Sequence, residues 1–257
     1  MRRRRRRRVL AVLLILLMVV LGLVIWFPAR WAWPLLAPRL AGVQLSGVHG
    51  TVWSGHADSV RWNGQALGQL SWQFDRSGVF GHATGTLALD APQWSAKVRW
   101  MRSGPDTLRL RDGQGWIDAG LVSASMLHGL KPAGRFVFSV PTLVLRNSWP
   151  VTLDAHVRWQ QAQLLGDGRS AALGDQQLSL HDQAGTTIVG QITSIGDTPL
   201  RSRGMLHISP LAWRAQLNLR AADAGNTALR RMLARLGKPA PDGSVQLVWR
   251  GGLLSGG

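Results

Sequence analysis

Reactive side chains are few in this chain, and their spacing matches no common kind of catalytic site. The seven histidines lie between His49 and His207 and form no H-x-x-x-H or H-x-H pair. All 13 acidic residues are aspartates, and they stand beside Gly, Arg or Ser, as turn-forming residues do. Cysteine is absent, which excludes disulfides, thiolate ligands and thiol nucleophiles. We therefore expect no metal ion, no cofactor and no catalytic residue.

Motifs for nucleotide binding and serine hydrolysis are also missing. No P-loop occurs, and no G-x-G-x-x-G follows a predicted strand. The segment GTVWSG places Ser54 beside Gly55 but lacks the spacing of a nucleophile elbow. These observations favour a protein that is not an enzyme.

A long apolar segment follows a run of arginines at the N-terminus. The arginines are Arg2, Arg3, Arg4, Arg5, Arg6, Arg7 and Arg8. The nineteen residues Val9–Phe27 contain no charged side chain. As a helix they would extend roughly 28 Å, close to the thickness of a hydrocarbon core of about 30 Å. Trp26, Trp31 and Trp33 lie where indole rings favour the membrane interface.

This pattern predicts a single-pass inner-membrane protein. The positive-inside rule places residues 1–8 in the cytoplasm as a basic tail and residues 9–27 across the membrane as an anchor. The rest of the chain then lies in the periplasm of a Gram-negative cell. The alternative is a cleaved signal peptide, whose apolar region would be about 7–15 residues long and would precede a small-x-small site. The following PARWAWPLLAPRL offers Trp and Pro instead, so we expect the anchor to be retained.

The charge outside the N-terminal tail is basic but dispersed. Seven of the 30 basic residues belong to the tail, and the remaining ones still outnumber the 13 aspartates. Scattered arginines are typical of a solvated β surface. Repeated V-R-W triplets could stack on bases, but no nucleic acid is expected as a partner in the periplasm.

The periplasmic part is predicted to be mainly β, with a minor α+β character. Pro28, Pro34 and Pro38 interrupt residues 28–46, which we expect to form a juxtamembrane linker. From Gly42 onward, short alternating segments separated by Gly, Asn and Asp predict strands. Asn63-Gly64 predicts a tight hairpin turn.

Two segments break the alternation and predict short amphipathic helices. In Asn226–Gly237 the stripe is Leu229, Met232, Leu233 and Leu236, with Asn226 or Thr227 as the cap. A weaker stripe occurs in Leu121–Pro132. We expect both helices to pack against the core.

Four sequence echoes occur in the same order and indicate an internal duplication. DAG precedes and KPA follows each predicted helix, SVRWNGQALG is echoed by HVRWQQAQLLG, and GTLALDAPQWSAKVRW has a looser echo in GMLHISPLAWRAQLNL. We infer two β-rich repeat units, residues 47–148 and 149–257. They could form two stacked modules or one continuous curved sheet.

The stretch GTVWSGHADSV, followed by LGQLSW, resembles the type II secretion system protein N family, also called general secretion pathway protein N. The likeness includes the N-terminal anchor and the terminal LARLGKPAPDGSVQLVWRGGL, whereas the run of seven arginines departs from the family pattern. The motif residues are Gly50, Thr51, Trp53, Ser54 and Gly55, for which a structural or partner-contact role is expected.

The resemblance implies a non-enzymatic component of the machinery that exports folded proteins across the outer membrane. Its periplasmic β domain would contact inner-membrane platform components or the outer-membrane secretin. A different hypothesis is an AsmA-like module that handles lipids or other apolar ligands on a curved sheet. A continuous concave apolar face with bound lipid would favour that alternative, and a closed, filled core would exclude it.

Overall fold

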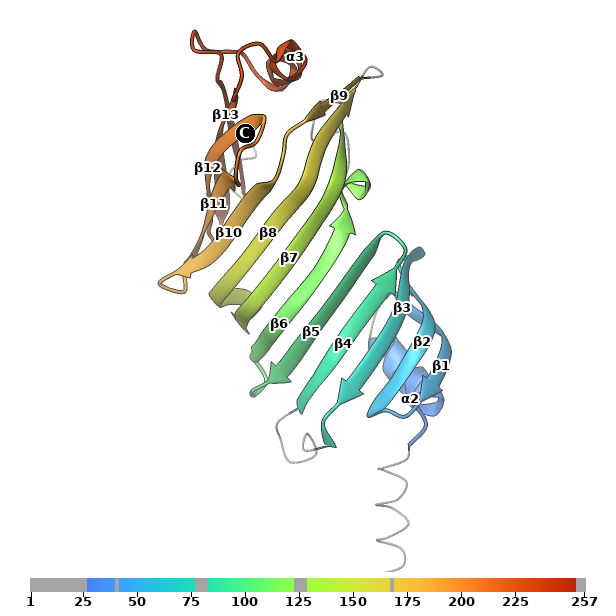
Figure 1. The fold of residues 1–257 in the computed structure, drawn as a ribbon. Coiled ribbons are helices and arrows are strands. Elements are labelled where there is room, and N and C mark those ends of the chain that lie inside the picture. The colour runs from blue at the N-terminus through green and yellow to red at the C-terminus, as the bar shows by residue number, and fades with distance from the viewer. Residues whose placement is uncertain (1–26, 40–41, 77–82, 123–128, 167–168, 253–257) are drawn as a thin grey trace, which may run out of the picture.

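One antiparallel sheet makes up most of the described chain (Figure 1). A computed structural model describes residues 27–39, 42–76, 83–122, 129–166 and 169–252. Its 14 strands follow one another across the sheet in chain order, except that β9 pairs with β8 beside the main path. The mainly β prediction is confirmed, and the sheet is continuous.

The strands fall into two groups on either side of the β7–β8 hairpin. The first group is β1 (Val43–Gly50), β2 (Ser54–Trp62), β3 (Gln65–Phe74), β4 (Ala83–Ala91), β5 (Trp94–Arg102), β6 (Thr107–Asp118) and β7 (Lys131–Arg146). The second group is β8 (Trp149–Gly166), β9 (Arg169–Ala172), β10 (Gln176–Gln183), β11 (Thr187–Ser194), β12 (Leu200–Ile208), β13 (Ala212–Ala221) and β14 (Val245–Gly252).

Three hairpins turn through pairs of residues with left-handed backbone conformations. Asn63 and Gly64 have φ of 48° and 83° between β2 and β3, as predicted. Asn147 and Ser148, with φ of 50° and 64°, join β7 to β8, and the pair at 184–185 joins β10 to β11. The first two connections have two residues and the third has three, 184–186. Left-handed residue pairs in such turns match the right-handed twist of paired strands. They explain why consecutive strands stay neighbours.

Strand register separates the side chains into an apolar face and a polar face. Cross-strand partners share a face because side chains alternate along each strand. One continuous row on the apolar face is Leu70, Leu89, Ala96, Gly115, Phe138, Val157, Leu178, Ile192, Gly204, Leu217 and Leu247. The adjacent row on the polar face is His56, Ser71, Ala88, Lys97, Gln114, Ser139, His156, Ser179, Gln191, Met205 and Gln216.

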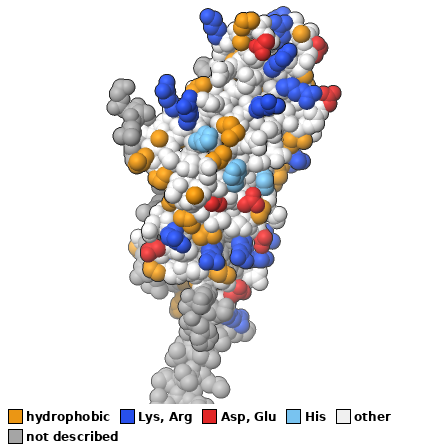
Figure 2. All heavy atoms as spheres, turned by 90° about the vertical axis from the view of Figure 1, so that its left-hand side faces the viewer, with side chains coloured by type: hydrophobic (Ala, Val, Ile, Leu, Met, Phe, Trp, Pro, Cys, Tyr) orange, Lys and Arg blue, Asp and Glu red, His pale blue; other side chains and the backbone are white. Residues whose placement is uncertain are grey.

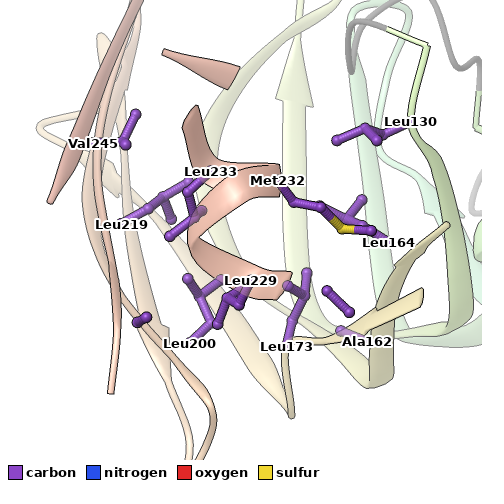
Figure 3. Packing of buried hydrophobic residues seen from close by; sticks show 12 residues of the cluster. Leu130, Ala162, Leu164, Leu173, Leu200, Leu219, Leu229, Met232, Leu233 and Val245 are labelled. Atoms are coloured by element: carbon purple, nitrogen blue, oxygen red, sulfur yellow. The ribbon is translucent and has the colours of Figure 1, made fainter. Parts of the chain in front are cut away.

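The C-terminal helix α3 (Thr227–Leu236) supplies the best-packed part of the molecule. The predicted cap is confirmed, because Asn226 Oδ1 accepts a hydrogen bond from the Leu229 N–H at 3.1 Å. Leu229, Met232 and Leu233 are buried along the predicted stripe. They pack between β8–β9 on one side and β12–β14 on the other (Figure 3). The sheet therefore closes around this helix on its apolar face.

The N-terminal helix α2 (Ala29–Leu36) packs on the same apolar face at the opposite end of the sheet. It is followed by a short 3-10 turn, Ala37–Arg39, and contains Pro34. Ala29, Ala32 and Trp33 line a cavity of about 180 Å³ together with side chains of β1, β3 and β4. Residues 28–46, predicted as a linker, thus contain a helix and the first half of β1.

Several expectations concern residues that the structure does not describe. The predicted anchor lies outside the described residues except for Phe27, and so do the arginine tail and Trp26. No helix within the described ranges has the length and apolar character to cross a membrane. Half of the second predicted helix, residues 123–128, also falls outside them. The prediction is wrong for its described residues, because Leu121 ends a 3-10 turn, Ala119–Leu121, and Lys131 and Pro132 begin β7.

The boundary between the two proposed repeat units coincides with the β7–β8 turn. Strands β7 and β8 pair along most of their length, from Lys131 with Leu165 to Arg146 with Trp149. Of the two arrangements considered, the structure has the continuous sheet. The echo SVRWNGQALG forms the β2–β3 hairpin, whereas HVRWQQAQLLG runs along the single strand β8.

The packing of α3 yields a stability prediction. Leu229→Ala removes a side chain with 0% exposure and leaves a cavity, so we expect a loss of about 2–5 kcal/mol in the free energy of unfolding. The matched control on the exposed side of the helix is Arg231→Ala, expected to change it by less than about 0.5 kcal/mol. Denaturant titration of both variants measures the difference, and equal midpoints would show that α3 does not contribute to the core.

Candidate functional site

The five motif residues come together in the turn between β1 and β2. The Thr51 N–H donates to the Ser54 carbonyl oxygen at 2.8 Å, and the Ser54 N–H donates to Thr51 Oγ1 at 3.1 Å. Gly50 has φ of 84°, and a Cβ there would lie 2.5 Å from the Ser54 oxygen. A residue with a side chain would be strained and would clash in this position. The motif therefore specifies a tight, self-bonded turn.

Trp72 of β3 holds this turn against the sheet. Its Nε1–H donates to the Thr51 carbonyl oxygen at 3.0 Å. A Cβ at Gly55 would lie 2.4 Å from the His49 oxygen and 2.6 Å from a ring carbon of Trp72. Gly55 is thus required by close packing of the indole on the backbone of its neighbour strand.

The same turn receives the chain that enters from the N-terminal segment. The Val52 N–H donates to the Phe27 carbonyl oxygen at 3.1 Å, and Pro28 forms a bridge with Thr51. The Trp53 oxygen accepts from the Phe74 N–H at 2.6 Å. The motif therefore joins the sheet to the residues that follow the predicted anchor. Sequence spacing gave no sign of this contact, because Phe27 and Val52 pair only in the folded chain.

The tryptophans assigned to the membrane interface lie in different surroundings. Trp31 is 64% exposed on α2. Trp33 is half-buried beside β1 and lines the cavity beneath the helix. Trp33 therefore contributes to packing between α2 and the sheet.

The apolar face between α2 and α3 is one candidate surface for binding. The described helices contact β1 at one end and β9, β13 and β14 at the other. On β4, β5, β7, β8 and β10, Leu87, Val98, Phe138, Val157 and Leu178 are half-buried and point to the same side. Leu87 also lines the cavity beside α2. Apolar surface of this extent is typical of an interaction or ligand-binding face.

The opposite face carries polar and charged side chains. Figure 2 shows histidine and basic side chains on one side of the molecule, with hydrophobic ones scattered among them. A trough of about 1040 Å³ lies over β2–β7 and is lined by His56, Ser71, Thr86, Lys97 and Gln114 among others. Ion pairs here, such as Arg99 with Asp112 at 3.0 Å, are exposed. Exposed pairs contribute little to stability.

One carboxylate has a shifted pKa, and its cause is structural. The hydrogen bond from the Ser244 hydroxyl to Asp242 at 2.7 Å, and next the one from the Ser244 N–H at 3.0 Å, lower the pKa of Asp242. This group lies exposed in the turn before β14. The shift therefore reports a turn and not a reactive centre.

These features define a β-sheet scaffold with an apolar face, a polar face and a tightly hydrogen-bonded turn between β1 and β2. Residues 41–248 match the sequence profile of the family described as "Type II secretion system (T2SS), protein N". The chain belongs to this family.

A curated relative supports the same assignment. It is the "Type II secretion system protein N" of Vibrio cholerae serotype O1 (strain ATCC 39315 / El Tor Inaba N16961), 35% identical over 104 residues. The match covers 40% of this chain and about a third (35%) of the relative. No solved structure matches the chain.

The geometry of the motif turn leads to a second prediction. Gly55→Ala introduces a Cβ against the His49 oxygen and Trp72, so we expect a loss of about 1–3 kcal/mol in the free energy of unfolding. Gly120→Ala is the matched control, because no atom lies within 4 Å of a Cβ built there. Thermal unfolding of both variants provides the measurement. Equal unfolding temperatures would show that the turn accommodates the added methyl group without loss of stability.

Proposed function

We propose that this protein is a non-enzymatic inner-membrane component of the type II secretion apparatus. In this proposal residues 9–27 cross the membrane once, residues 1–8 stay in the cytoplasm and the sheet lies in the periplasm. Membership of the protein N family supports a role in this apparatus. The positive-inside pattern of Arg2–Arg8 supports the orientation.

The motif turn supports a tethered arrangement. The Phe27 carbonyl oxygen bonds to Val52 at the point where the predicted anchor ends. Helix α2 then packs directly on β1. With so little chain between anchor and sheet, the sheet would be held close to the membrane surface.

The observation that carries the proposal is the apolar face left uncovered by α2 and α3. The edge strand β14 adds a second contact surface, because β13 is the one described strand that it pairs with, and its other edge has a single bridge, between Val245 and Pro239. Val248 and Trp249 on this strand are 47% and 38% exposed. An open edge can accept a strand of another protein through main-chain hydrogen bonds. Platform components or the secretin would supply the contacting surfaces.

Edge contact is tested by placing a charge on β14. Lysine on an edge strand opposes strand addition, so we expect Val248→Lys to reduce both exoprotein export and co-purification of other secretion components. Met205→Lys is the matched control, because Met205 lies in the same cross-strand row on the interior strand β12 and is 40% exposed. Equal export by the two variants would contradict the proposal that the β14 edge contacts other secretion components. Unchanged export after deletion of the gene would contradict the proposed function itself.

A second function, the binding of lipid or another apolar ligand, is favoured by one specific observation. The row from Leu70 on β3 to Leu247 on β14 contains no charged residue. Such a face resembles the open trough expected of an AsmA-like module, and it is not the closed, filled core that would exclude it.

Photolabelling distinguishes this second function. Full-length protein is reconstituted with vesicles that contain a phospholipid with a photoreactive acyl chain. If the face binds lipid, labelled peptides should include apolar positions of β4–β7, such as Leu87 and Phe138. Labelling confined to residues 9–27 and α2 would exclude a lipid trough and leave protein contact as the function of the face.

A further inference from the structure

Two histidines and an aspartate converge on the β1–β2 hairpin. His49 and His56 are cross-strand partners, and their rings stack with centroids 5.1 Å apart and planes at 26°. Asp58 Oδ2 lies 3.5 Å from His49 Nε2, and its Oδ1 lies 3.8 Å from His56 Nε2. One potential ligand atom from each residue lies within 4.8 Å of those of the other two. The cluster is adjacent to the motif turn in sequence.

The backbone brings these three side chains to one face. His56 and Asp58 flank Ala57, which is buried, so both point to the exposed side of β2. His49 joins them because the GTVWSG turn folds β1 onto β2 in that register. The two histidines are seven residues apart in the sequence, and the hairpin places them directly opposite each other on neighbouring strands.

Gly47 makes room for the carboxylate. It lies opposite Asp58 in the hairpin, because its neighbours Ser46 and Val48 pair with Ser59 and Ala57. Its φ is 62°. A Cβ at this position would lie 2.1 Å from Asp58 Oδ2. The carboxylate therefore occupies space that any other residue would fill, and this placement brings it to the two imidazoles.

The arrangement contributes little as an ion pair alone. The side chains of His49, His56 and Asp58 are about 60% exposed, and exposed pairs typically contribute no more than about 1 kcal/mol. Two stacked histidines would also repel each other if both were protonated. Neutral imidazoles beside a carboxylate avoid this repulsion and are a favourable ligand set for a metal ion.

The distances suit a tetrahedral ion. With metal–nitrogen bonds of about 2.0–2.1 Å, neighbouring ligand atoms of a tetrahedron lie roughly 3.3 Å apart. The separations of 3.5 and 3.8 Å join the two imidazole Nε2 atoms to different oxygens of Asp58, and one candidate ligand atom from each of the three residues lies within 4.8 Å of the other two. The side chains must therefore rotate towards one another to reach the tetrahedral spacing. Exposure leaves an entry path and leaves one or more coordination positions to water or to a side chain of a bound partner.

We propose that His49, His56 and Asp58 bind one divalent transition-metal ion, with Zn²⁺ as the best match to two imidazoles and a carboxylate. The ion links β1 to β2 beside the turn that receives the N-terminal segment. Binding to the folded hairpin stabilises it in proportion to metal concentration and affinity. This inference is independent of the proposed role in secretion.

Isothermal titration of the full-length protein with ZnCl₂ tests the proposal. We expect one equivalent of zinc to bind and the unfolding temperature to rise with zinc concentration. His49→Ala and Asp58→Asn should each weaken binding on the order of tenfold or more. His207→Ala is the control, because His207 is also exposed but lies on β12, outside the cluster.

A spectroscopic readout separates this site from unspecific binding. Cobalt(II) in the site should give visible absorption typical of tetrahedral coordination, and His56→Ala should abolish it. Because all three side chains are exposed, the metal-free variants should unfold at the temperature of the parent protein. Zinc binding that persists in all three cluster variants, or that His207→Ala weakens equally, would overturn the proposal. Absence of saturable binding to the parent protein would do the same.

Discussion

The constraint on which the whole molecule depends is strand register. Side chains alternate between faces with a period of two, so a slip of one residue would move every side chain of a strand to the wrong face. The register shifts at three places: between Ala57 and Val60 on β2, between Lys97 and Arg99 on β5, and between Ser139 and Thr142 on β7. Each shift absorbs an extra residue locally. The apolar row therefore remains unbroken from Leu70 to Leu247, and the histidine pair on the hairpin depends on the same alignment.

This register explains why the sheet needs helices at its ends and leaves its centre open. An apolar face gains stability by losing contact with water. Helix α3 supplies that cover through Leu229, Met232 and Leu233, and α2 supplies it through Trp33. Between these two helices the apolar side chains on the described strands are half-buried. In the proposed role, such a face would contact another component of the secretion apparatus.

Local sequence signals predicted the elements that short-range chemistry determines. Asn63-Gly64 identified a hairpin, and the stripe from Leu229 to Leu236 with the Asn226 cap identified α3. The motif residues were singled out, but their role in bonding to Trp72 and Phe27 depends on contacts distant in sequence. For the same reason the choice between stacked modules and one sheet stayed open. Sequence analysis misses the cluster at His49, His56 and Asp58, because patterns such as H-x-H describe two ligands on the same strand. Histidines on both sides of a predicted turn are the sequence signal that indicates it.

Selective cysteine labelling tests most directly whether the apolar face is the contact surface, and the chain contains no native cysteine. Leu87 and Ala88 are adjacent on β4, are both half-buried and point to the apolar and polar faces respectively. Cysteines introduced singly at these positions would be labelled with a maleimide in the purified protein and in cells that assemble the secretion apparatus. The account predicts that residue 87 is labelled in the purified protein and protected in cells, while residue 88 is labelled in both. Equal labelling of residue 87 in the two settings would contradict it.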